Sequence, residues 1–219
     1  MVRRTDGRHV RLSNGRRNRA VGRYASVKMG GTVPWESRLE LHDLYRAEVD
    51  PNITSFFVQP ETLHWQNEGR AKTYTPDRLD YMANGSVRVV EVKDVYDPAD
   101  DPEYTQKLAE AEKIYAVIGR NFVLRDSAVV RAQPDFAAVE EVQAFRRAVV
   151  TIQDLDRVGE VLANGWRPLG EVLAAIGRQR PRATLFAMMV RRFVNIDLTR
   201  GLPDSANVSL FPDPTSCGD

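Results

Sequence analysis

The dipeptide Asn84-Gly85 is the most constraining feature of this 219-residue sequence, because it separates two short segments with the composition of β-strands. Asn-Gly is the dipeptide most typical of a tight hairpin turn. The flanking segments are residues 77–82 and 87–92, and the second is rich in valine, which is enriched in strands. We therefore predict an antiparallel β-hairpin over residues 77–92.

Three charged side chains are expected to converge at the open end of this hairpin. Side chains alternate between the two faces of a strand, so Glu91 and Lys93 should share one face while Val92 points into the core. Pairing about the turn places Asp77, at the start of the first strand, near Glu91 and Val92. The pattern predicts two carboxylates and a lysine at one end of a sheet.

The segments around the hairpin predict an α/β (α+β) fold, in which a mixed sheet is flanked by a helix on each side. A first helix is expected to open at Pro34 and to stop at Asp50-Pro51-Asn52, and a second to end at Gly119. Further strands are expected over residues 53–59, 62–66, 72–75 and 121–124. This order of elements argues against a doubly wound parallel sheet, which would alternate strands and helices.

The last third of the chain has a different pattern of elements. Three helices are expected, and after them a β-hairpin that turns at Gly201-Leu202-Pro203-Asp204. The expected helices cover residues 152–163, 169–176 and 182–193, and the expected strands cover residues 194–198 and 207–211. Three helices followed by a hairpin are typical of a winged helix.

Charge is distributed unevenly along the chain. Residues 1–30 carry nine Arg and Lys residues against Asp6 alone, a net charge of +8, whereas the whole chain carries +1. We interpret this glycine-containing segment as a flexible arm that binds a polyanion, because arginine forks suit phosphate groups; a solvated tail without a partner is the alternative. The candidate DNA-binding residues are Arg16, Arg17, Arg19, Arg23 and Lys28.

The expected domains are therefore an arm over residues 1–30, a domain built on the mixed sheet over 31–130, a winged-helix-like domain over 131–211 and a tail over 212–219. No apolar run approaches the roughly 20 residues needed to cross a bilayer, so no membrane partner is expected. Cys217 is the only cysteine, which excludes a disulfide framework within the chain and favours a cytoplasmic location.

Carboxylates and a lysine at a strand end suit phosphodiester hydrolysis. Carboxylate oxygens bind Mg²⁺ or Mn²⁺ and leave positions open for water and a phosphate oxygen, and the bound metal lowers the pKa of its water. A lysine beside the metal can orient that water. The competing interpretation is a solvated sheet edge with ion pairs, because short D…E-x-K strings arise by chance when 28% of residues are charged.

Five short motifs together resemble the N-terminal nuclease domain of TnsA-like transposon endonucleases. In chain order they are W-E-S-R-L-E from Trp35, D-P-N-I from Asp50, F-F-V-Q-P ending at Pro60, Y-T-P-D ending at Asp77 and V-E-V-K ending at Lys93. They follow the family's order and spacing over about residues 20–125. The resemblance implies a restriction-endonuclease-like PD-(D/E)XK core and metal-dependent cleavage at the 5′ ends of a transposon.

The resemblance also implies roles for single residues. The implied catalytic residues are Glu40, Asp77, Glu91 and Lys93, and the implied ligands of Mg²⁺ or Mn²⁺ are Asp77, Glu91, Val92 and Glu40. Glu36, expected one helical turn before Glu40, is the alternative helix carboxylate. The candidate accessory residues are Glu36, Gln59 and Lys107.

The implied partners are double-stranded DNA, a separate transposase subunit that acts at the 3′ ends, and an ATPase regulator that contacts the C-terminal domain. Two other functions remain compatible with the sequence. One is a stand-alone PD-(D/E)XK restriction or repair nuclease, and the other is a non-catalytic DNA-binding adaptor that keeps the fold.

Overall fold

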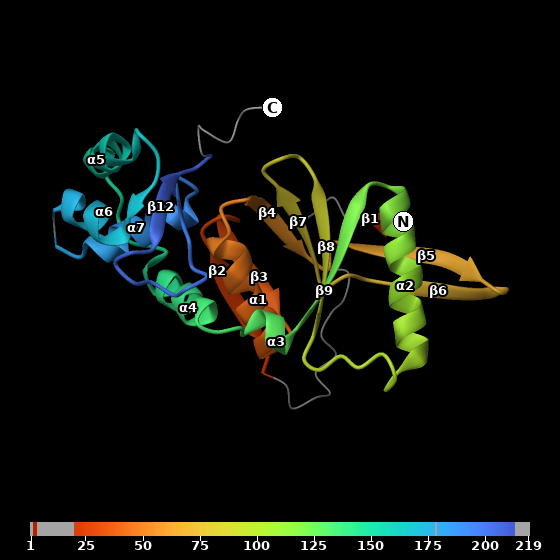
Figure 1. The fold of residues 1–219 in the computed structure, drawn as a ribbon. Coiled ribbons are helices and arrows are strands. Elements are labelled where there is room, and N and C mark those ends of the chain that lie inside the picture. Colours follow the sequence, from red (N-terminus) through yellow and green to blue (C-terminus); the bar gives the residue numbers. More distant parts are fainter. Residues whose placement is uncertain (1, 4–19, 178, 213–219) are drawn as a thin grey trace. The chain divides into compact units, whose positions relative to one another are not determined.

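The computed structural model describes residues 2–3, 20–177 and 179–212 (Figure 1). The chain divides into two compact units, the first formed by Met1–Leu44 and Ile53–Val130 and the second by Tyr45–Asn52 and Arg131–Asp219. Helix α1 (Arg38–Val49) belongs to the first unit up to Leu44 and to the second unit from Tyr45 on. Within the described ranges, no helix has the length and apolar character required to span a membrane.

A four-stranded mixed sheet forms the centre of the first unit. Its strand order is β4-β7-β8-β9. These strands are β4 (Ile53–Val58), β7 (Arg78–Met82), β8 (Val87–Lys93) and β9 (Arg120–Asp126). Strand β9 runs parallel to β8 and the other neighbours are antiparallel, because helix α2 (Pro102–Val117) returns the chain between β8 and β9. The expected mixed sheet flanked by helices is confirmed.

The hairpin about Asn84-Gly85 is formed by β7 and β8. Its register pairs Arg78 with Val90 and Tyr81 with Val87. Gly85 has a φ of 82°, a value that L side chains rarely adopt and that accounts for glycine at this position. The turn closes through a hydrogen bond from the amide of Met82 to the carbonyl of Ser86, 2.9 Å long.

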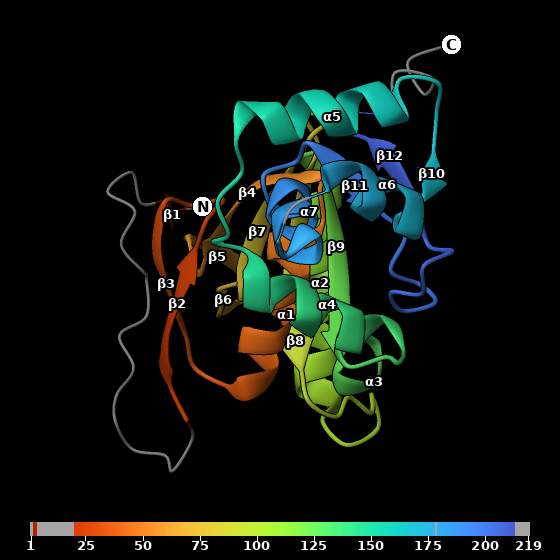
Figure 2. The same cartoon turned by 90° about the vertical axis from the view of Figure 1, so that its left-hand side faces the viewer.

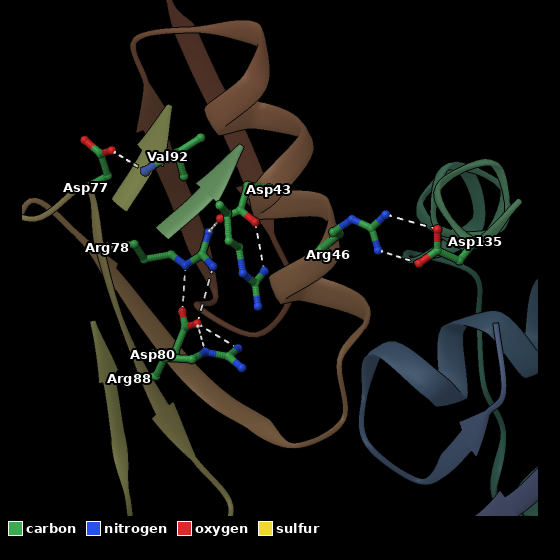
Figure 3. Close-up of polar contacts among 9 residues, drawn as sticks. Asp43, Arg46, Asp77, Arg78, Asp80, Arg88, Val92 and Asp135 are labelled. Atoms are coloured by element: carbon green, nitrogen blue, oxygen red, sulfur yellow. Dashed lines mark hydrogen bonds and ion pairs between the residues drawn. The ribbon is translucent and has the colours of Figure 1, made fainter. Parts of the chain in front are cut away.

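The two faces of the sheet have different chemistry. One face packs on α2 around an apolar core that includes Leu79, Val89 and Tyr115, all fully buried. The residues that alternate with Leu79, namely Arg78 and Asp80, point to the opposite face, where Arg78 contacts α1 (Figure 3). Alternation along β7 therefore separates an apolar interface with α2 from a charged interface with α1.

Two smaller sheets complete the first unit. Strand β5 (Glu61–Asn67) pairs with β6 (Arg70–Tyr74) on one edge and with β1 (Val2–Arg3) on the other. Strands β2 (Gly22–Ser26) and β3 (Gly31–Trp35) form a separate hairpin, visible side by side in Figure 2. The short helix α3 (Ser127–Val130) follows β9 at the end of the unit.

Two expectations for this region are wrong. Residues 22–26 of the segment interpreted as an arm form strand β2, because Tyr24 on β2 and Val33 on β3 are buried and give the hairpin an apolar side. Pro34 does not open α1 but lies in β3 opposite Arg23, a place that tolerates a residue without an N–H group because the sheet has only two strands. The helix begins at Arg38, where the side chain of Ser37 accepts a hydrogen bond from the amide of Glu40 at 3.1 Å.

The second unit contains the three helices and the hairpin expected from the sequence, together with an unexpected helix, α4 (Asp135–Phe145). The expected helices are α5 (Ile152–Leu162), α6 (Leu169–Ile176) and α7 (Pro181–Val190). The strands β10 (Arg167–Pro168), β11 (Val194–Ile196) and β12 (Asn207–Leu210) form a sheet in the order β10-β12-β11. All residues from Ala183 to Val190 of α7 are buried, so α7 is the core helix of this unit (Figure 2).

Candidate active site at the open end of the central hairpin

Asp77 lies immediately before β7, at the end of the hairpin opposite the turn. Its Oδ2 accepts a hydrogen bond from the amide of Val92 at 2.8 Å (Figure 3). Its carbonyl oxygen accepts a second bond from the amide of Gln59, 2.9 Å away. Asp77 is therefore held both to β8 and to the residue that follows β4, and it lies beside Val92 as the hairpin pairing predicted.

Glu91 and Lys93 lie on the same face of β8. Glu91 is 8% exposed, and its Oε2 accepts a hydrogen bond from the hydroxyl of Tyr74 at 2.6 Å while Oε1 accepts one from the hydroxyl of Tyr104. The Nζ of Lys93 lies 4.4 Å from the centroid of the Tyr104 ring. The shared contact with Tyr104 agrees with the strand alternation expected from the sequence.

Glu40 and Asp77 line one pocket of the first unit. The pocket residues are Pro34, Glu40, Leu44, Val58, Asp77, Arg78 and Val92. Its cavity volume is about 10 Å³, which is room for about one water-sized sphere. Val92 is thus half-buried against this Glu40–Asp77 pocket rather than enclosed in the core, which corrects the expected placement of its side chain.

The structure also distinguishes Glu40 from Glu36. Glu36 precedes α1, and its amide donates a hydrogen bond to Oε2 of Glu40 at 2.8 Å. The two residues are therefore not one helical turn apart, as was expected, because Glu36 lies in the bend between β3 and α1 and only Glu40 is part of the helix. It is Glu40, in the first turn of α1, that reaches the pocket.

Negative charge and burial act together on this region. Burial raises the pKa of Glu40, hydrogen bonds from the amide of Glu36 and from Ser37 oppose that shift, and the charges of Glu36 and Glu91 add to it. Burial, followed by the charge of Glu91 and the hydrogen bond to it, raises the pKa values of Tyr74 and Tyr104 well above the ordinary tyrosine value. Both phenols therefore keep their protons at neutral pH and remain hydrogen-bond donors.

A buried network of ion pairs fixes α1 against the sheet. Asp43 is fully buried and accepts hydrogen bonds from Arg78 at 2.5 Å and from Arg125 at 2.9 Å. Asp80 joins the network through Arg78 at 2.6 Å and Arg88 at 2.9 Å (Figure 3). Asp43 follows Glu40 by three residues, about one helical turn. The network therefore holds the helix that carries Glu40 next to the strand that follows Asp77.

The donor atoms at the pocket suit a hard divalent cation. Carboxylates and backbone carbonyls are the ligands of Mg²⁺ and Mn²⁺, and Mg²⁺ is usually held by one or two carboxylates with several waters. Glu40 and Asp77 would supply the carboxylates, and Val92 can contribute only through its carbonyl. Among the described residues, no group of three or more His, Cys, Asp and Glu side chains has the arrangement of a metal site.

Glu91 faces the two tyrosines, on the opposite side of β8 from the side chain of Val92. An oxygen of an ionised carboxylate keeps acceptor capacity after it receives one hydrogen bond. Hydrogen-bonded partners that orient a ligating carboxylate are usual around metal ions in proteins. The contacts of Glu91 with Tyr74 and Tyr104 are therefore compatible with a role beside the pocket.

The remaining candidate residues have varied positions. Arg16, Arg17 and Arg19 lie outside the described residues. Arg23 is on β2 and donates to Oγ1 of Thr32 at 3.2 Å, and Lys28 lies in the turn between β2 and β3. Lys107 is on α2, one turn after Tyr104.

Sequence reasoning missed Tyr74 and Tyr104 as neighbours of the site. Tyr74 begins the motif that ends at Asp77, so its proximity to that residue was available from the sequence. Nothing local marks Tyr104, which belongs to α2, a different element from the strand it contacts.

Comparison with known proteins does not assign this chain to a family. No model of a protein family matches the sequence, and no curated protein matches it. Any inference about function is therefore drawn from the geometry and chemistry of the residues described above.

Proposed function

We propose that this chain is a metal-dependent DNA endonuclease with a PD-(D/E)XK active site, acting as the strand-cleaving subunit of a transposase of the TnsA-like kind. The observation that carries the proposal is the arrangement at the open end of the central hairpin. There Asp77 is bonded to the amide of Val92 and shares a pocket with Glu40. Glu91 and Lys93 occupy the other face of the same strand end.

Each residue has a chemical role in this proposal. Glu40, Asp77 and the Val92 carbonyl bind Mg²⁺ or Mn²⁺, with Glu91 as the further carboxylate beside them. When bound, the cation supplies Lewis-acid polarisation of the phosphate and a water of lowered pKa. Lys93 is exposed, so its ammonium group is accessible to a phosphate oxygen and can offset the charge that develops during cleavage.

The architecture supports the proposal. A PD-(D/E)XK core has a mixed sheet between helices, and the order β4-β7-β8-β9 with α1 and α2 on opposite faces has this organisation. The second unit has the element order of a winged helix, in which β10, α6 and α7 precede the β11–β12 hairpin. We assign the second unit to contacts with DNA or with an ATPase regulator, and the basic N-terminal segment to DNA phosphates.

A plasmid-nicking assay combined with Mn²⁺ calorimetry tests the proposal. Asp77→Ala and Glu91→Ala should each lower the nicking rate by at least about 100-fold, the loss typical of removing an electrostatic stabiliser, and Asp77→Ala should also weaken Mn²⁺ binding. Glu112→Ala is the matched control, because Glu112 is an exposed carboxylate on α2. Its nicking rate and Mn²⁺ affinity should equal those of the wild type.

The two measurements separate the possible failures. Full cleavage by Asp77→Ala would show that the metal site lies elsewhere in the chain. A wild-type protein that binds DNA, but neither binds Mn²⁺ nor nicks with the transposase subunit present, would be a non-catalytic adaptor.

A further inference from the structure

Tyr104 contacts both members of the Glu91–Lys93 pair. Its hydroxyl donates to Oε1 of Glu91, and the face of its ring lies 4.4 Å from Nζ of Lys93. A cation over an aromatic face is attracted by the ring quadrupole. One side chain from α2 thus holds an anion through its hydroxyl and a cation through its ring.

The backbone of Tyr104 is itself fixed. Tyr104 lies in the first turn of α2, and its amide donates to Oδ1 of the helix-capping residue Asp101 at 2.9 Å. Its ring has only two side-chain torsions, so a fixed backbone leaves it few alternative positions. Lys93, by contrast, is exposed and has four rotatable side-chain bonds, so the ring restricts a group that would otherwise sample many rotamers.

Tyr74 holds the other oxygen of Glu91. It is 3% exposed and packs edge-on against Tyr115, with ring centroids 6.4 Å apart. Its hydroxyl reaches Oε2 of Glu91 at 2.6 Å. The two tyrosines thus orient the carboxylate of Glu91 through both of its oxygens, but only Tyr104 also contacts Lys93.

We propose that Tyr104 is a positioning residue that sets the orientation of Glu91 and Lys93 relative to each other. The inference rests on the proposed nuclease function, because the pair acts on a phosphodiester only in that case. Outer contacts that orient a metal-site carboxylate typically account for about 10- to 100-fold in metal affinity or activity. A tyrosine present only for packing would be replaceable by phenylalanine.

Two substitutions separate the contributions of Tyr104. Tyr104→Phe removes the hydroxyl and keeps the ring under Lys93, whereas Tyr104→Leu removes both. Tyr96→Phe is the matched control, because the Tyr96 hydroxyl bonds Oγ1 of Thr105 at 3.1 Å and removing it deletes a hydroxyl from the same region.

Three readouts are compared for the full-length protein. They are the Mn²⁺ affinity by calorimetry, the nicking rate at saturating metal, and the NMR shift of ¹³C-dimethylated Lys93. The Lys93 signal is assigned as the one that is missing from the spectrum of Lys93→Arg. Tyr104→Phe should lower the Mn²⁺ affinity or the nicking rate by about 10- to 100-fold and keep the ring-current shift of Lys93. Tyr104→Leu should abolish the ring-current shift of Lys93 and should lower the Mn²⁺ affinity or the nicking rate at least as much as Tyr104→Phe does. Tyr96→Phe should match the wild type in all three readouts.

The outcomes distinguish this inference from the proposed function. Failure of the wild type to bind Mn²⁺ and to nick DNA would contradict the proposed function. The NMR shift of Lys93 would still report whether the Tyr104 ring holds the lysine. Wild-type Mn²⁺ affinity and nicking in Tyr104→Phe would overturn the positioning role in an otherwise active nuclease. The positioning role would also be overturned if the loss of nicking in Tyr104→Phe were fully explained by the fraction of unfolded protein, measured by circular dichroism. The same holds if the NMR shift of Lys93 in Tyr104→Leu equals that of the wild type.

Discussion

Replacing Asp43 by alanine removes an acceptor shared by two arginines in the first unit. The side chain of Asp43 is 0% exposed, and those of Arg78 and Arg125 are 3% and 16% exposed. Removal of one partner from a buried ion pair costs about 3–5 kcal/mol, because the remaining charge is left without compensation in a poorly solvated place. Arg78 keeps its contact with Asp80 and Arg125 is partly exposed, so we expect the lower end of this range, about 3 kcal/mol.

Thermal and urea unfolding followed by tryptophan fluorescence measure this loss. In a Trp166→Phe background the remaining tryptophans are Trp35 and Trp65, and both belong to the first unit. A loss of about 3 kcal/mol corresponds to a decrease in Tm of about 6–12 °C for a chain of this size.

Glu103→Ala is the control for the Asp43 substitution. It removes a surface ion pair of the same unit, with Lys72 at 3.6 Å and the Glu103 side chain 86% exposed, and it should change the unfolding free energy by less than about 1 kcal/mol. If Asp43→Ala destabilises the first unit no more than Glu103→Ala does, the buried network does not hold α1 on the sheet and the argument is refuted.

Two further predictions concern acid stability and DNA binding. Burial acts to raise the pKa of Asp80, but the charges and hydrogen bonds of Arg78 and Arg88 outweigh it, so the pKa is lowered. Ionised Asp80 therefore stabilises the folded state fully above the ordinary aspartate pKa of about 4. This stabilisation is lost as the pH falls through the lowered pKa. Thermal unfolding between about pH 2 and pH 7 should therefore show that Asp80→Asn loses less stability on acidification than the wild type, and equal losses would contradict this. The second prediction is tested by DNA-binding titrations of a variant in which the five basic candidates are replaced by glutamine. The slope of log affinity against log salt should flatten by up to about 4.5 units if each residue contacts a phosphate. An unchanged slope would show that these residues do not contact DNA phosphates. These candidates are Arg16, Arg17, Arg19, Arg23 and Lys28.

Local patterns were sufficient for the elements nearest the candidate site. Asn84-Gly85 predicted the β7–β8 hairpin, and its register brought Asp77 to Val92. The three helices and the hairpin of the second unit followed from periodicity and turn residues in the same way. These features depend on backbone conformations and side-chain alternation that are decided within a few neighbouring residues.

The errors arose where one residue type suits two structures. Pro34 is favourable at the start of a helix and also tolerated in a two-stranded hairpin, and the structure has it in the hairpin. The basic residues around Tyr24 suggested an arm, but burial of that side chain against its hairpin partner produces strand β2. Propensity alone does not decide between such alternatives, because the burial that favours one depends on the packing of other segments.

The sequence by itself determined the central hairpin, the common face of Glu91 and Lys93, and the position of Asp77 beside Val92 at the open end of that hairpin. Only the tertiary structure decided that Glu40 rather than Glu36 lines the pocket, that Asp43 binds Arg78 and Arg125, and that Tyr104 contacts both members of the pair. The reason is the range of the interactions. Alternation and turns act between near neighbours in the chain, whereas the contact between Asp43 and Arg125 spans 82 residues and exists only once α1 and β9 pack in the same unit.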